Sequence, residues 1–131
     1  MSKLKPISVL LVDNNPIFLR AASRFLETHA EVVVVGAAAG GEEALVRAQE
    51  LQPQVVLIDL AMPDLPGLQA IPRLREMLPD MGIIALTMLD TESYRRAALA
   101  AGADEFVPKA AMHTALLPSI RRSVKIEAVR K

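Results

Sequence analysis

Cysteine and tryptophan are absent from the 131 residues, and the aromatic content is only three phenylalanines and one tyrosine. The lack of cysteine excludes disulfide frameworks, cysteine nucleophiles and thiolate metal sites, and it fits a reducing cytoplasm. So few aromatic side chains leave no stacking platform for single-stranded nucleic acid. Neither sign of charge is in excess, because 15 Lys and Arg balance 15 Asp and Glu. We therefore do not expect this segment to bind nucleic acid or an anionic membrane directly.

Long apolar runs are also missing. The longest stretch without a formal charge, Ala110–Ile120, is 11 residues and contains Pro118, so it cannot span a bilayer. The N-terminal residues lack the apolar core of a signal peptide. Hydrophobic residues nevertheless make up 52% of the chain and charged residues 23%, as in a folded globular domain. We expect a cytoplasmic module that forms one domain over residues 1–131, with its core at about 7–124.

Short apolar runs recur along the chain at fairly even intervals. The first four are rich in β-branched residues and do not alternate with polar ones, which is typical of parallel strands buried on both faces. The five runs are Ile7–Val12, Val32–Val35, Val55–Ile58, Ile83–Leu86 and Phe106–Val107.

The segments between these runs have helical spacing of apolar residues. Asn15-Pro16 resembles an N-cap followed by a first-turn proline, and Gly102 is expected to end a helix. The sequence predicts helices after Asn15, over Glu42–Leu51, around Leu68–Leu78 with Pro72 in or near the first turn, over Thr91–Ala101, and over Ala111–Ala128. Pro118 in the last helix predicts a kink or a delayed start. Lys125–Lys131 is expected to be the fraying end of that helix.

Alternating strands and helices predict a doubly wound α/β fold of the (βα)₅ type, with a five-stranded parallel sheet covered by helices on both faces. We find no internal repeat and no linker. The chain either stops at its last helix or continues into a second domain that lies outside the given sequence.

Polar side chains follow the predicted strands where each one ends. Asp13 and Asn14 follow the first strand, Asp59 the third, Thr87 the fourth and Lys109 the fifth. Ligands of open parallel sheets bind outside the carboxyl ends of the strands, so these side chains should converge. Carboxylate, amide, hydroxyl and ammonium groups together suit a divalent cation and an anionic group.

The sequence around these residues resembles the receiver domain of bacterial two-component response regulators. Four segments carry the resemblance, in order and at four predicted strand ends: Leu10–Asp13, Leu57–Pro63, Ala85–Thr87 and Gly102–Lys109. The match runs from about Ser8 to Arg122. The resemblance implies a flavodoxin-like fold with sheet order 2-1-3-4-5.

The resemblance also implies a phosphoacceptor and a metal site. Asp59 would take a phosphoryl group from the phosphohistidine of a sensor histidine kinase or phosphotransfer protein. The metal would be Mg²⁺, held by Asp13, Asn14, Asp59 and the backbone carbonyl of Ala61. The domain would then be a signalling switch rather than a turnover enzyme.

By the same resemblance, Thr87 and Lys109 would bind the phosphoryl oxygens, and Phe106 would take part in the conformational switch. Met62 and Met88 would stand at the access to the site. The switched surface would be the fourth helix, fifth strand and fifth helix, or else the first and fifth helices, either of which could form a homodimer. The output, expected to be transcription, would reach DNA only through a second domain.

Three positions depart from the family pattern. Asn14 stands where a second acid is usual, and the missing charge predicts a loss of about 1–2 kcal/mol in metal affinity. Met88 replaces a small residue beside Thr87. Ala110 follows Lys109 where many receivers have proline, and this variation is common in the LuxR/NarL subfamily. The sequence Ile120-Arg121-Arg122 in the last predicted helix also resembles that subfamily.

Two other functions remain open from the sequence. The Asn14 substitution would also suit a degenerate receiver that acts as a phosphorylation-independent interaction or dimerisation module. A flavodoxin-like binder or an aspartate-nucleophile phosphatase is the weakest hypothesis, because that phosphatase motif needs a second aspartate where Ala61 stands.

Overall fold

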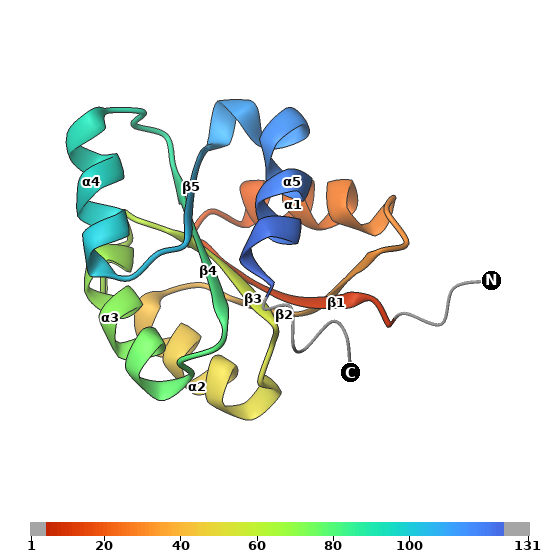
Figure 1. Ribbon diagram of the computed structural model, residues 1–131, viewed down its shortest axis with the longest axis horizontal. Coiled ribbons are helices and arrows are strands. Elements are labelled where there is room, and N and C mark those ends of the chain that lie inside the picture. The colour runs from red at the N-terminus through yellow and green to blue at the C-terminus, as the bar shows by residue number, and fades with distance from the viewer. Residues whose placement is uncertain (1–4, 125–131) are drawn as a thin grey trace.

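The computed structural model describes residues 5–124 and contains a parallel sheet flanked by helices (Figure 1). The strands are β1 (Ile7–Val12), β2 (Val32–Ala38), β3 (Val55–Asp59), β4 (Gly82–Thr87) and β5 (Glu105–Pro108). The helices are α1 (Pro16–Glu27), α2 (Gly41–Leu51), α3 (Gly67–Met77), α4 (Glu92–Ala101) and α5 (Met112–Ser123), and the short 3₁₀ helix η1 (Lys109–Ala111) precedes α5. The predicted (βα)₅ fold is confirmed.

The strands lie in the order β2-β1-β3-β4-β5, as expected, and all neighbours pair in parallel. After β1 the chain adds β2 on one side, and it then crosses to add β3 on the other. The direction of winding therefore reverses between β1 and β3. At such a switch point two neighbouring connections leave in opposite directions and open a crevice at the carboxyl ends of the strands.

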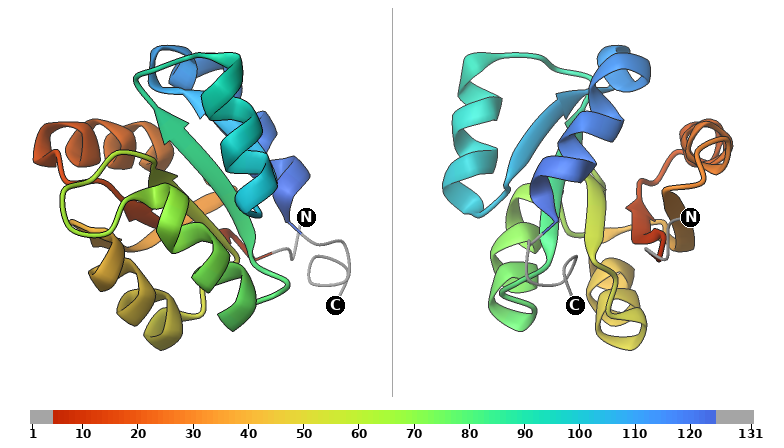
Figure 2. Two further views of the ribbon diagram at one scale, coloured as in Figure 1. Left: turned by 90° about the vertical axis from the view of Figure 1, so that its left-hand side faces the viewer. Right: turned by 45° about the vertical axis from the view of Figure 1, so that its right-hand side comes forward.

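Two layers of helices bury the sheet (Figure 2). On one face, α2, α3 and α4 pack through residues such as Ala44, Ile71 and Ala98. On the other face, α1 and α5 pack through Leu26, Leu116 and their neighbours. Every residue of β3 and β4 is buried, which explains their continuous apolar sequences.

β2 differs from the prediction of a strand buried on both faces. It lies at the edge of the sheet, and its residues alternate between buried or half-buried and exposed, with Val33 and Val35 exposed. Its register with β1 shifts where Val9 pairs with Val34 and Leu10 pairs with Gly36, so Val35 has no direct partner. Apolar β-branched sequence alone does not separate such an edge strand from a central one.

The helix ends follow their capping residues. The Asn15 side chain accepts hydrogen bonds from the backbone amides of Ile17 and Phe18, and Pro16 is the first residue of α1. Thr91 caps α4, and Gly102 ends it with a positive φ of 123°. The cap at Asn15, the first-turn Pro16 and the helix end at Gly102 are confirmed, whereas Thr91, predicted as the first residue of its helix, is the cap residue instead.

Both helix prolines lie inside helices, Pro118 as predicted. Pro72 was expected in or near the first turn of α3, but the helix begins at Gly67 and Pro72 lies in its second turn. Pro118 lies inside α5, which begins at Met112 after the 3₁₀ turn of η1. The helical part that the structure describes ends at Ser123, and the predicted continuation to Ala128 lies outside the described residues.

Candidate functional site

The carboxyl ends of β1, β3, β4 and β5 bring together the polar residues that the sequence singled out. Asp13 directly follows β1, Asp59 and Thr87 are the last residues of β3 and β4, and Lys109 directly follows β5. Asp59 pairs with Leu86 in the sheet register, which puts Thr87 one residue beyond it on the neighbouring strand. The predicted convergence is therefore present in the structure.

Lys109 joins the two carboxylates. Its Nζ lies 2.5 Å from Oδ2 of Asp13 and 3.3 Å from Oδ1 of Asp59. All three side chains are nearly removed from solvent, with exposed fractions of 9%, 1% and 8% for Lys109, Asp13 and Asp59. Buried charges of this kind persist when they are paired, because an uncompensated one is strongly destabilising.

An aromatic ring completes the surroundings of the ammonium group. The Lys109 Nζ lies 4.3 Å from the centroid of the Phe18 ring on α1, which is within the range of a cation–π interaction. The sequence analysis missed Phe18, because its place in the apolar face of α1 is indistinguishable from ordinary core spacing.

Asp13 is held by the backbone on both sides. Its amide donates to the Ala38 carbonyl at 3.0 Å, and its Oδ1 accepts from the Asn15 amide at 2.8 Å. A carboxylate that bonds the amide two residues later forms a local turn, which fixes its direction. Asp13 therefore uses one oxygen for this turn and the other for Lys109. Asn14, the next residue, is exposed.

Burial dominates the electrostatics of Asp59. It raises the pKa of the Asp59 carboxyl, the Lys109 ammonium opposes this, and the nearby Asp13 carboxylate raises the pKa further. Hydrogen bonds from Lys109 and from the backbone of Ala61 lower it by smaller amounts. The net rise means that a negative charge on Asp59 is costly in the folded protein without additional positive charge.

Thr87 is buried and holds the loop that follows β4. Its Oγ1 accepts from the Leu89 amide at 2.9 Å, which leaves its hydroxyl proton for an acceptor at the site. Met88, the next residue, is 77% exposed. Its predicted role at the entrance stays a prediction.

Met62 is only 5% exposed and packs in the core cluster with Leu60 and Leu65. Its predicted place at the access to the site stays a prediction. Phe106 is buried in the same cluster, together with Ala98 and Ala103 beside α4. Because the Phe106 ring is packed in this cluster, a change in its position requires α4 and its neighbouring residues to rearrange.

The donor atoms suit a hard cation. Asp13 and Asp59 offer carboxylate oxygens, Asn14 carries an amide oxygen, and Ala61 is exposed beside Asp59. Mg²⁺ prefers such oxygen ligands and keeps several waters, so it does not need a complete protein cage. In residues 5–124 no group of three or more His, Cys, Asp or Glu side chains could hold a metal, which fits Asn14 in place of a third acid.

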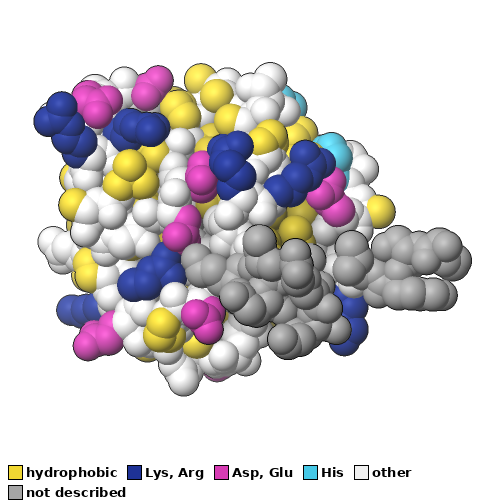
Figure 3. Space-filling view, in the orientation of Figure 1, with side chains coloured by type: hydrophobic (Ala, Val, Ile, Leu, Met, Phe, Trp, Pro, Cys, Tyr) yellow, Lys and Arg dark blue, Asp and Glu magenta, His cyan; other side chains and the backbone are white. Residues whose placement is uncertain are grey.

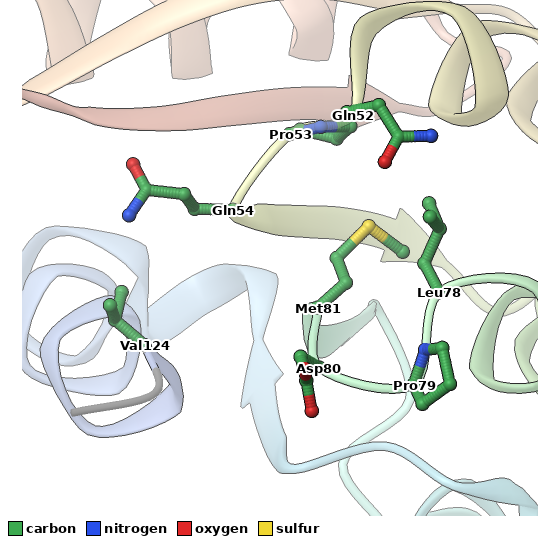
Figure 4. A pocket seen from close by; sticks show the side chains of 8 residues that line it. All are labelled: Gln52, Pro53, Gln54, Leu78, Pro79, Asp80, Met81 and Val124. Atoms are coloured by element: carbon green, nitrogen blue, oxygen red, sulfur yellow. The ribbon is translucent and has the colours of Figure 1, made fainter. Parts of the chain in front are cut away.

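A pocket of about 280 Å³ lies at the opposite edge of the sheet (Figure 4). Gln54 and Met81, which directly precede β3 and β4, line it together with Val124 at the end of α5. It is therefore separate from the polar site.

The described part of the chain has no helix of the length and apolarity needed to cross a membrane.

The chain is similar to known proteins over most of its length. The family pattern described as "Response regulator receiver domain" matches residues 9–121. The chain is 34% identical over 125 residues to the response regulator protein VraR of Staphylococcus aureus, covering 94% of this chain. It spans 59% of the length of that relative.

Solved structures show the same fold. The receiver domain of the response regulator NarL from Mycobacterium tuberculosis has 27% identity and a TM-score of 0.79, over 89% of this chain and 98% of that one. The response regulator domain of Thermotoga maritima CheB has 28% identity and a TM-score of 0.84, over 90% and 96%. Together with the ordered motifs and their convergence at one sheet edge, these findings show that the chain belongs to the receiver domain family of two-component response regulators.

Proposed function

We propose that Asp59 is the phosphoacceptor of this receiver. The observation that carries the proposal is the buried Lys109 ammonium, which lies between the Asp13 and Asp59 carboxylates. An Asp59 oxygen would attack the phosphorus of a phosphohistidine, forming the P–O bond as the P–N bond breaks and the imidazole leaves. Lys109 then neutralises one phosphoryl oxygen, and the Thr87 hydroxyl donates to another. The phosphohistidine would belong to a sensor histidine kinase or phosphotransfer protein.

The same proposal assigns the metal ligands. Asp13, Asn14, Asp59 and the Ala61 carbonyl would hold Mg²⁺, which supplies positive charge where phosphoryl oxygens gather. The raised pKa of Asp59 supports this role, because a cation restores the charged, nucleophilic carboxylate. In the absence of the metal, Lys109 alone provides that charge.

Acetyl phosphate with Mg²⁺ tests the acceptor. Intact-mass analysis should show one added phosphoryl group on the parent protein and none on Asp59→Asn. Asp80→Asn is the matched control, since Asp80 lines the pocket at the opposite edge of the sheet, and it should be modified like the parent. Unchanged modification of Asp59→Asn would contradict the assignment.

The output surface belongs to the same proposal. Phosphorylation would shift α4 and the surface that it shares with β5 and α5, or else promote association through α1 and α5. Supporting the first, α4 buries only Ala98 completely, so little packing holds it. Exposed ion pairs Arg121–Glu31 and Arg122–Glu105 lie on the α5 side, where Figure 3 shows opposite charges close together. DNA would be reached through a domain outside residues 1–131.

A degenerate receiver is the second candidate, favoured by one observation. Asn14 is an exposed amide at the position of a usual acidic ligand. If Asn14 abolishes the metal site, the domain would act as a phosphorylation-independent interaction module. Addition of beryllofluoride and Mg²⁺ separates the two candidates, because only the phosphoacceptor should show shifted amide resonances around Asp59.

A further inference from the structure

The loop between β3 and α3, residues 60–66, carries the Ala61 backbone that lies beside Asp59. At its start, the Leu60 amide donates to the Leu86 carbonyl at 3.0 Å. At its end, the Gly67 amide donates back to the Leu60 carbonyl at 3.0 Å. The middle of the loop is held by a different element, the start of α2.

Asp64 makes that connection. Its Oδ1 accepts from the Gly41 amide at 3.2 Å, and its Oδ2 accepts from the Glu42 amide at 3.3 Å. These amides belong to the first turn of α2, whose own cap position is Gly40 and offers no side chain. The loop therefore supplies the cap from more than twenty residues away, at the positive end of the helix dipole. The hydrogen bonds from Leu65, Glu42 and Gly41 also lower the pKa of Asp64.

The contact is too close for any side chain at the start of α2. A Cβ at Gly40 would lie 2.5 Å from both Asp64 carboxylate oxygens, and one at Gly41 would lie 2.2 Å from the Leu65 carbonyl oxygen. Leu65 itself is buried in the core. The loop therefore packs directly against the backbone at the start of α2, and Ala61 lies in the sequence between this contact and the end of β3.

We infer that Asp64 is a positioning residue for the acceptor site, since it holds the 60–66 loop against α2 and so fixes the Ala61 backbone beside Asp59. This inference rests on the proposed function. Asp64 is not among the residues proposed to hold the phosphoryl group or the metal, and its printed contacts are with the backbone of the loop and of α2. Outer residues that orient metal ligands typically change metal affinity by tenfold or more when they are replaced.

A pair of variants separates this role from simple capping of α2. Asp64→Ala removes both the cap and the tether. In that background Gly40→Ser adds a local cap, because Gly40 has an extended backbone and the carboxylate that would collide with its Cβ is gone. The double variant should recover the parent's urea midpoint but not its Mg²⁺ affinity, which stays about tenfold weaker than in the parent. Glu42→Gln is the charge control and should bind Mg²⁺ like the parent.

Amide hydrogen exchange provides a readout that needs neither metal nor phosphodonor. The Leu60 and Gly67 amides should exchange faster in both Asp64→Ala and the double variant than in the parent. Recovery of slow exchange and of Mg²⁺ affinity in the double variant would show that Asp64 is only a cap, and parent-like values in Asp64→Ala would equally overturn the inference. A parent protein that is not modified at Asp59, with accelerated loop exchange in the variants, would instead count against the proposed function alone.

Discussion

Lys109 is the residue on which the charge balance of the site depends. Its ammonium is the only cationic group paired with the Asp13 and Asp59 carboxylates in the part of the chain that the structure describes. Two buried acids and one base leave a net negative charge in a place where water is scarce. That imbalance would suit a bound cation, and in its absence it carries a cost in folding stability.

Replacing Asp59 should therefore stabilise the metal-free protein. At pH 7, Asp59→Asn should raise the free energy of unfolding by about 0.5–2 kcal/mol. Because the folded pKa of Asp59 is raised, the carboxyl's unfavourable contribution is absent below the unfolded pKa of about 3.9 and develops as pH rises through the folded pKa. The increase in unfolding free energy that Asp59→Asn causes should therefore become smaller as the pH falls toward about 3.9. Urea unfolding at several pH values measures it, and a destabilised variant at pH 7 would contradict this account.

Lys109 predicts the reverse effect. Lys109→Met keeps much of the aliphatic length but leaves Asp13 and Asp59 without their cation, so we expect a loss of about 3–5 kcal/mol at pH 7. The loss should be smaller in the double variant with Asp59→Asn, where only one carboxylate remains uncompensated. Equal losses in the two backgrounds would show that the pairing of Lys109 with Asp59 does not stabilise the fold.

On the proposed function, we expect Asn14 to limit the affinity for Mg²⁺. Restoring the acid with Asn14→Asp should tighten Mg²⁺ binding roughly tenfold, which corresponds to about 1.4 kcal/mol. Titration of each protein with Mg²⁺ measures the difference. Equal or weaker affinity in the variant would mean that the amide is already an adequate ligand.

At the scale of elements, a network of hydrogen bonds holds the C-terminal end of α4. The guanidinium of Arg75 on α3 donates to the Gly102 carbonyl through Nε at 3.2 Å and Nη2 at 2.8 Å, and to the Met81 carbonyl at 2.7 Å. It also pairs with Asp104 at 2.8 Å, just before β5. The C-terminal end of α4 is therefore joined to α3, β4 and β5.

The response to phosphorylation should follow this arrangement. With beryllofluoride and Mg²⁺, we expect amide exchange to change most between Met88 and Phe106, and within α4 mainly in its N-terminal half. Phe106→Ala should diminish that response without preventing modification of Asp59. Exchange that changes uniformly across the domain, or only inside the site, would contradict a relay through α4.

The sequence predicts the elements well and their surroundings less well. The β-branched runs, the cap at Asn15 and the helix end at Gly102 are local signals, and the structure confirms them. The exposed face of β2 and the position of Pro72 depend on which elements lie alongside, which local patterns do not encode. Asp13, Asp59, Thr87 and Lys109 could be placed at one edge by topology alone.

Contacts across the chain could not be predicted from the sequence. The cation–π contact with Phe18 depends on how α1 is oriented over the sheet. The capping of α2 by Asp64 depends on the path of the loop between β3 and α3, which lies more than twenty residues further along the chain. Both contacts join side chains or backbone groups that no spacing rule connects.

At the scale of the whole molecule, lowering the pH changes the stability contributions of the surface ion pairs and of the polar site in opposite directions. A hydrogen-bonded ion pair with Arg121 lowers the pKa of Glu31. Its contribution is present above its ordinary value of about 4.3 and is lost as pH falls through the lowered folded pKa. Protonation of Asp59 is favourable over a higher range of pH, because burial raises its pKa.

Removing one surface partner isolates the first effect. Arg121→Gln should leave the unfolding free energy nearly unchanged at pH 3 and lower it slightly at pH 7, because exposed pairs contribute little and are screened by salt. Urea unfolding at both pH values, at low and high salt, checks this expectation. A larger loss at pH 3 than at pH 7 would contradict the sign.

The contact between Lys109 and Asp13 joins residues 96 positions apart. During synthesis, which proceeds from the N-terminus, both carboxylates exist long before the ammonium that pairs with them. A nascent or truncated chain that ends before β5 would hold Asp13 and Asp59 without their cation, and β4 without its last neighbour. The polar site is therefore complete only with the final βα unit. On the proposed function, an unfinished copy of this domain would lack the ammonium group that receives the phosphoryl group, and it would not compete with complete copies for the phosphodonor.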